Sequence, residues 1–119
     1  MDQQAWVITF NGSIEEVDYQ AGILKDLLLN ISADIKVTQK PESEYTQGGV
    51  GGLIIKWKAA KDAVQKVVKA IAAFLQSTHS ASINIEIKDG KLTRLEMKNI
   101  TSKDCDKTLK DILEYLKSS

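Results

Sequence analysis

The most constraining feature of this sequence is a helical repeat of apolar residues between positions 60 and 77. Its apolar members recur every three or four residues: Ala60, Val64, Val67, Val68, Ile71, Phe74 and Leu75. The polar residues between them lie away from this stripe: Lys61, Gln65, Lys66 and Lys69. A period near 3.6 residues predicts an amphipathic helix, because one helix face then meets a core and the other meets water.

Three short runs predict strands, since they are rich in β-branched and aromatic residues or alternate apolar with polar ones. The first covers about residues 5–11 and puts Trp6, Ile8 and Phe10 on one face. The second, "ADIKVTQ", alternates apolar and polar side chains. The third, "LIIKWK" at residues 53–58, fits either a strand or the first turn of the long helix, and we favour the strand.

The segment after the first strand predicts another helix. Ser13 and Glu16 have the spacing of a capping box at its start. The apolar stripe behind them is Val17, Ala21, Leu24, Leu28 and Ile31. Gly22 weakens this helix by up to about 1 kcal/mol relative to Ala. Asp18, which is also a good capping residue, is therefore an alternative start.

The segment "SINIEIKDGKLTRLEMK" predicts a β-hairpin around an Asp-Gly turn. A two-residue loop would set a charged residue across from Ile85, against the apolar face. A three-residue loop, residues 88–90, instead pairs Ile85 with Thr93. It also pairs Ile83 with Leu95, so we predict this second register.

A last helix is predicted to begin at a cap formed by Thr101 or Ser102. Its apolar face consists of Cys105, Leu109, Ile112, Leu113 and Leu116. The element order is β-α-β-(β)-α-β-β-α, which is typical of the α+β class. We expect one domain over residues 1–119: a small mixed sheet of four to five strands packed against two or three helices, with a C-terminal β-hairpin and helix.

Composition narrows the functional classes. The 119 residues fit one domain, and a hydrophobic share of 43% allows a real core. The formal net charge of zero disfavours a dedicated nucleic-acid binder. The single cysteine, Cys105, fits a reducing compartment. Because the sequence shows no signal-peptide pattern and no apolar run of membrane-spanning length, we expect a cytoplasmic protein.

Charge is unevenly distributed along the chain. Residues 1–34 carry six acids and one base, whereas residues 35–79 carry seven lysines and three acids. Five lysines lie between residues 56 and 69, and the first two flank Trp57: Lys56, Lys58, Lys61, Lys66 and Lys69. Lysines neutralise phosphates and an indole stacks on bases, so nucleic-acid or nucleotide binding through the lysine face of the long helix and the glycine-rich loop near residues 48–52 is an alternative function. The only arginine, Arg94, lies elsewhere, and base recognition depends heavily on arginine.

The segment "YTQGGVGGLIIKW" holds four of the seven glycines: Gly48, Gly49, Gly51 and Gly52. A phosphate-binding P-loop needs a glycine followed by lysine and a hydroxyl residue. Here Gly52 is followed by Leu53 and Ile54. We therefore interpret the cluster as a flexible or closely packed connection and not as a phosphate site.

Candidate catalytic and metal-binding residues are few. His79 is the only histidine and Cys105 the only cysteine, whereas a structural zinc site needs several such ligands. A Cys105–His79 pair is the sole candidate for a small enzyme. The acidic groups complement helix N-termini and need no catalytic explanation. We expect no enzymatic activity, no metal and no cofactor.

Taken whole, residues 5–117 resemble the effector-associated constant component domain of bacterial conflict systems. The resemblance follows the order "WVITF", "ILKDLLL", "DIKVT", "QKPESEYTQGGVGGL", "IAAFLQS", a hairpin with a "DG" turn, and a final helix. It implies a non-catalytic adaptor that couples a trigger to an effector such as a caspase-like or trypsin-like peptidase. The family offers no enzymatic residues to carry over.

We expect a protein partner, an effector peptidase or toxin encoded nearby, and neither nucleic acid nor a membrane. The expected contacts are the glycine-rich loop and the exposed lysines: Gly48, Gly49, Gly51, Gly52, Lys58, Lys61, Lys66 and Lys69. An unpaired edge strand would in addition permit a homodimer.

Overall fold

The fold is known from a computed structural model, which describes residues 3–12, 14–31, 35–40, 52–58, 61–78, 81–89 and 92–118. Its elements are β1 (Gln3–Phe10), α1 (Ile14–Leu29), β2 (Lys36–Lys40), β3 (Gly52–Lys58), α2 (Lys61–Ser77), β4 (Ile83–Asp89), β5 (Leu92–Ile100), the 3₁₀ helix η2 (Ser102–Asp104) and α3 (Cys105–Ser118). This order and the α+β class agree with the expectation. The segment 53–58 is a strand, as favoured.

The five strands form one sheet in the order β2-β3-β1-β4-β5. All four neighbouring pairs are antiparallel, so the sheet is not mixed as expected. The reason is topological: β1 and β2 run in the same direction, but β3 lies between them, and β1 likewise separates β3 from β4. Two split β-α-β units are thus interleaved, as in ferredoxin-like folds, and β5 and α3 extend this pattern.

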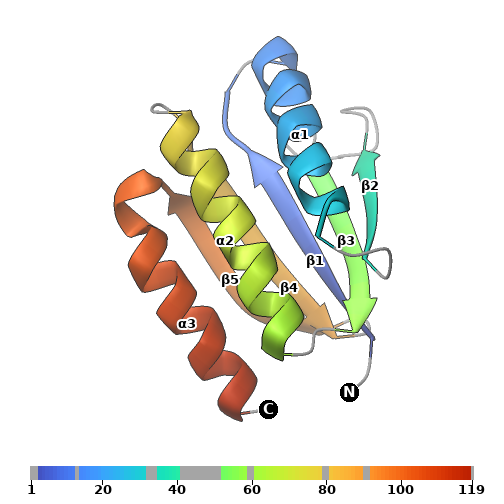
Figure 1. The fold of residues 1–119 in the computed structure, drawn as a ribbon, viewed down its shortest axis with the longest axis vertical. Helices are drawn as coiled ribbons and strands as arrows, with labels where there is room; N and C mark the ends of the chain where they lie inside the picture. The colour runs from blue at the N-terminus through green and yellow to red at the C-terminus, as the bar shows by residue number, and fades with distance from the viewer. Residues whose placement is uncertain are drawn as a thin grey trace.

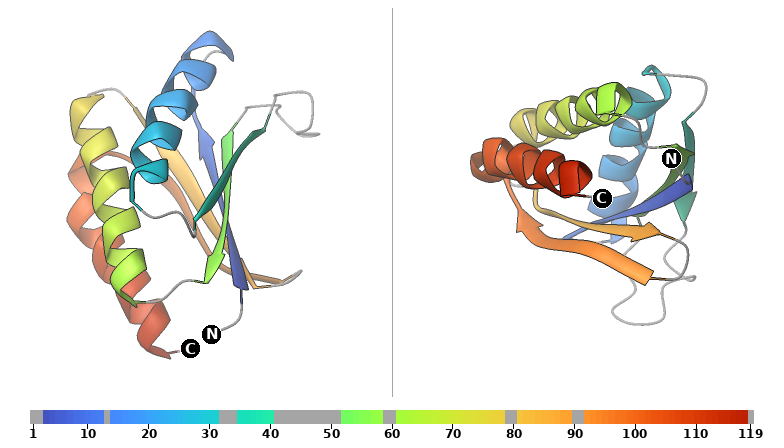
Figure 2. Two further views of the ribbon diagram at one scale, coloured as in Figure 1. Left: turned by 45° about the vertical axis from the view of Figure 1, so that its right-hand side comes forward. Right: turned by 90° about the horizontal axis from the view of Figure 1, so that it is seen from below.

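The three α-helices cover the same face of the sheet, and no described helix covers the other (Figures 1 and 2). The core lies between these two layers. Trp6, Ile8 and Phe10 are fully buried there, which confirms the predicted inward face of β1. The buried part of the predicted α2 stripe is Val64, Val67, Val68, Ile71, Phe74 and Leu75. An edge-to-face ring pair joins the two layers: the centroids of Phe10 on β1 and Phe74 on α2 are 5.6 Å apart.

The helix starts follow local capping chemistry. α1 begins at Ile14, so the alternative start at Asp18 is wrong; Ser13 lies outside the described residues. Thr101 caps the final helical segment: its amide and its hydroxyl both donate to Asp104 Oδ2, at 3.3 and 3.1 Å. This is the reciprocal half of a capping box.

The predicted hairpin register is wrong. Ile85 faces Met97, four positions beyond Thr93, and Ile83 faces Ile100. Asp89, which the prediction places in the loop, pairs with Leu92, and residues 90–91 lie outside the described residues. The observed register gives the three isoleucines of β4 three apolar partners on β5, Ile100, Met97 and Leu95, where the predicted register gave one.

Two irregularities in β5 make this register fit. The pairing shifts between Ile87 and Lys88 and again between Ile83 and Ile85. At the second shift Asn99 adopts a positive φ of 57°. The Asn99 amide donates to the Asn84 side-chain oxygen Oδ1 at 2.8 Å. This side chain thus accepts the hydrogen bond of a backbone amide at a bulge, where the regular pairing of strands is interrupted.

Gly52, the one described glycine of the cluster, is required by close packing. It pairs with Thr9 near the start of β3. A Cβ atom built on Gly52 would collide with the carbonyl oxygen of Ile8. The absence of a side chain at Gly52 thus serves the approach of two backbones. Gly48, Gly49 and Gly51 lie outside the described residues.

Candidate interaction surface

The structure separates the lysines that the sequence places near one another. Lys56 is exposed on the helix-free face of the sheet, since it alternates with the buried Ile55 and Trp57. Lys66 and Lys69 are exposed on α2, on the opposite side of the sheet. These described lysines therefore do not form one continuous basic surface. The backbones of Lys58 and Lys61 end β3 and begin α2, and their side chains lie outside the described set.

Trp57 belongs to the core. Its side chain is 2% exposed, and its ring packs edge-to-face on Trp6 with centroids 5.0 Å apart. A base could not stack on this indole unless the sheet and the helices separated. The aromatic part of the alternative nucleic-acid hypothesis thus has no exposed platform at Trp57.

The helix-free sheet face carries a shallow, open hollow of about 410 Å³. It is lined by Val7, Thr9, Asn84, Ile85, Glu86, Glu96 and Lys98. The polar groups there bond largely to one another. Lys98 pairs with Glu96 at 3.1 Å, Lys88 pairs with Glu86 at 3.1 Å, and Asn84 Nδ2 donates to Thr9 Oγ1 at 3.1 Å. The charges around this hollow are thus largely neutralised, as is common on the face that an antiparallel sheet turns to water.

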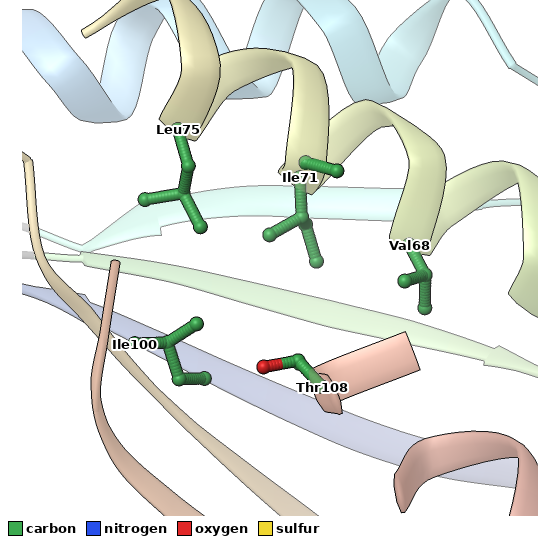
Figure 3. Close-up of a pocket in the computed structure, with 6 residues that line it drawn as sticks. Val68, Ile71, Leu75, Ile100 and Thr108 are labelled. Atoms are coloured by element: carbon green, nitrogen blue, oxygen red, sulfur yellow. The ribbon is translucent and has the colours of Figure 1, made fainter. Parts of the chain in front are cut away.

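A second space lies between α2, α3 and the end of β5 (Figure 3). Its apolar walls are Val68, Ile71, Ala72, Leu75 and Ile100. The Thr108 hydroxyl, turned toward Ile100, is its polar group (Figure 3). At about 10 Å³ the space has the volume of one water molecule and not of a metabolite. Thr108 is buried, although the predicted apolar face of the last helix did not include it. Ile112, which that face did include, is buried as predicted.

Residues that could bind a metal do not gather in the described part of the chain. No three His, Cys, Asp or Glu side chains there lie close enough to hold an ion. His79 is outside the described residues. Cys105 begins α3, but its side chain is outside them too. The Cys105–His79 hypothesis therefore stays a prediction.

The most unusual surface in the described residues is the outer side of α1. Three large hydrophobic side chains are exposed, and all lie on this helix: Tyr19 (73%), Leu27 (37%) and Leu29 (47%). Tyr19 and Leu29 belong to a row of five residues that we call the α1 ridge: Glu15, Tyr19, Gly22, Asp26 and Leu29. The row points away from the buried stripe of α1, because its members are exposed or half-exposed.

Sequence reasoning did not identify the α1 ridge, although its signal was present. Tyr19 and Leu29 stand off the apolar stripe that begins at Val17, so the core does not need them. An apolar residue on the polar side of an amphipathic helix is the pattern that marks such a surface.

None of the described helices combines the length and apolar character that crossing a membrane requires. No family model matches the chain, and no curated protein matches it. The resemblance to the effector-associated domain therefore stays a prediction.

Among the described strands, β2 and β5 lie at the two edges of the sheet. Whether an edge strand pairs with a second copy of the chain stays a prediction.

Among solved structures, the fold is similar to that of the de novo designed protein Foldit4, with a TM-score of 0.54 and 8% identity over 76% of this chain and 100% of that chain. A phage SAM lyase is similar at lower scores. Its complex with S-methyl-5'-thioadenosine has a TM-score of 0.37 and 15% identity, over 83% of this chain and 88% of that chain. Its apo state has a TM-score of 0.38 and 16% identity, over 84% and 89%. The design supports the fold alone, and the lyase carries no argument about activity.

Proposed function

We propose that this chain is a non-catalytic interaction module of a prokaryotic defence system. It couples a trigger to an associated effector, such as a caspase-like or trypsin-like peptidase encoded nearby, and acts in the cytoplasm. Two things support the proposal. One is the resemblance in element order and loop pattern; the other is the exposed surface of α1.

The observation that carries the proposal is the exposure of Tyr19. A tyrosine ring that is 73% exposed contributes little to the core, yet it offers a large apolar surface and a hydroxyl. Tyrosine is enriched at protein interfaces, where truncating a central residue costs about 2 kcal/mol or more of binding free energy. Since Leu29 is exposed in the same row of α1 as Tyr19, a partner that covers this row would bury both side chains.

Co-purification tests this function. The chain and the product of the neighbouring effector-like gene are co-expressed, and their complex is measured by size-exclusion chromatography and calorimetry at micromolar concentration. We expect a complex that Tyr19→Ala weakens. Ala73→Ser is the matched control, because Ala73 is exposed on α2. No complex at micromolar concentration would refute the proposal.

The nucleic-acid alternative makes a separate prediction. Binding through phosphates must fall steeply with salt and must be lost on Lys61→Glu plus Lys66→Glu. We expect a fluorescent single-stranded oligonucleotide to show no such binding, because the described lysines are divided between two sides of the sheet and Trp57 is buried. Tight, salt-dependent binding would favour the alternative over the adaptor.

A further inference from the structure

The spacing of the α1 ridge is that of a helix-packing seam. Its five residues are separated by alternating steps of four and three positions, so they lie in one line along the helix. From Glu15 to Leu29 the line is about 21 Å long at a rise of about 1.5 Å per residue. Alternating three- and four-residue steps are the repeat along which two helices pack. The opposite side of α1 already packs on the core through Val17, Leu24 and Leu28. The ridge is therefore a second, uncovered seam.

Gly22, at the middle of this seam, has no neighbour among the described residues that requires a glycine. Beyond its own stretch of helix, no described atom lies within 4 Å of the position that its Cβ would occupy. Its backbone is helical, so no positive φ requires a glycine. Glycine within a helix is unfavourable relative to alanine. A missing side chain at this point does allow another helix to approach the α1 backbone closely, as small residues do where helices cross.

Charge determines which helix would fit. Glu15 and Asp26 are exposed near the two ends of the ridge, eleven positions or about 16 Å apart. The neighbouring Lys25 is half-buried and lies off this line. A second copy of α1 packed about a two-fold axis would bring acids together, which is unfavourable. A helix with Lys or Arg three turns apart would place a cation at each end of the ridge.

We propose that the α1 ridge binds a basic amphipathic helix of the partner protein, with the apolar stripe of that helix on Tyr19 and Leu29 and its closest approach at Gly22. This inference rests on the interaction function proposed above and adds the chemistry of the partner. The site is a helix surface of this chain, distinct from the glycine-rich loop and the α2 lysines expected from the sequence.

A synthetic peptide tests the proposal on the full chain. The probe is a fluorescein-labelled 21-residue helical peptide with one apolar stripe and two lysines eleven positions apart. Fluorescence anisotropy measures affinity, and ¹H–¹⁵N NMR locates the site. We expect saturable binding with chemical-shift changes concentrated on α1, and Tyr19→Ala to weaken it at least tenfold. No binding at millimolar protein, or shift changes centred on other elements, would overturn the proposal.

Gly22→Gln separates contact from folding. Glutamine is a good helix former and the position has open space, so we expect the melting temperature to rise. The same variant should bind the peptide at least tenfold more weakly, because its side chain keeps the second helix away. Loss of affinity alongside a gain in stability cannot come from unfolding. Unchanged affinity would overturn the proposed crossing point.

Charge reversal tests orientation and specificity. Asp26→Lys should weaken the lysine peptide about tenfold and strengthen a peptide in which glutamate replaces both lysines. Asp106→Lys is the matched control, since Asp106 is an exposed acid on α3 and the charge change is the same. If both variants changed the peptide affinity equally, the binding would depend on net charge alone, and the proposed site would be wrong.

The two proposals fail separately. If the effector co-purifies but the peptide does not bind α1, the partner chemistry is wrong and the adaptor function stands. If the peptide binds α1 as described but the effector does not co-purify, the surface stands and the adaptor function is wrong.

Discussion

Replacing either of two glycines by alanine should change stability in opposite directions. At Gly52 the added methyl group would collide with the carbonyl oxygen of Ile8, in the central strand of the sheet. That backbone is held on both sides by β3 and β4, so it cannot recede without loss of pairing. At Gly22 the methyl group enters open space on a helix.

The magnitudes follow from these surroundings. Overpacking against Ile8 costs up to about 3 kcal/mol, and alanine recovers up to about 1 kcal/mol of backbone entropy. We therefore expect Gly52→Ala to lower the unfolding free energy by about 2 kcal/mol. Gly22→Ala should raise it by up to about 1 kcal/mol.

Chemical denaturation and calorimetry measure both variants. Unfolding entropy near 2.1 cal/mol/K per residue gives about 250 cal/mol/K for 119 residues. One kcal/mol then shifts Tm by about 4 °C, so we expect a fall of about 8 °C for Gly52→Ala and a rise of up to about 4 °C for Gly22→Ala. Gly22→Ala controls for the entropy that any glycine replacement removes from the unfolded chain. Shifts of the same sign in both variants would refute the close-packing explanation of Gly52.

Three further variants test other contacts. Asn84→Ala removes the acceptor of the Asn99 amide, so we expect a loss of about 1 kcal/mol and faster hydrogen exchange at Asn99; unchanged exchange would contradict the bond. Asp104→Ala removes the acceptor of both Thr101 donors, so we expect a loss of about 1 kcal/mol in denaturation experiments, and an unchanged midpoint would show that the cap is not needed. Phe74→Ala empties a fully buried site, so we expect a loss of about 3–5 kcal/mol by urea unfolding, and a loss below 1 kcal/mol would mean that the layers pack loosely there.

The periodicity of apolar residues predicted the helices and strands because the type of each element depends mainly on the sequence of its own segment. The α2 stripe and the inward face of β1 needed only the alternation of apolar and polar residues. The strand at 53–58 followed from β-branched content. These patterns do not specify which strands become neighbours, so a mixed sheet was expected where β3 inserts next to β1 and makes every pairing antiparallel.

The hairpin register depended on contacts that a short window cannot contain. The Asp-Gly pair led to a predicted three-residue loop at residues 88–90, but Ile100, the partner of Ile83, lies beyond the segment from which that register was argued. Matching Ile100 to Ile83 requires a bulge at Asn99. The candidate surface was missed for a related reason. Gly22 was interpreted as a weakness of the helix, and only the structure shows that no side chain among the described residues packs against it.

The central position of β1 has a consequence for the newly made protein. Gln3 pairs with Lys58 and Phe10 pairs with Ile83, so both sheet neighbours of β1 are synthesised well after β1 itself. Until β3 and β4 have been made, the strand that carries Trp6, Ile8 and Phe10 lacks the two strands that flank it. Pairings this distant in sequence must close large loops, so folding is expected in milliseconds to seconds and not microseconds. The apolar face of β1 thus stays without its sheet partners for as long as those distant segments take to arrive.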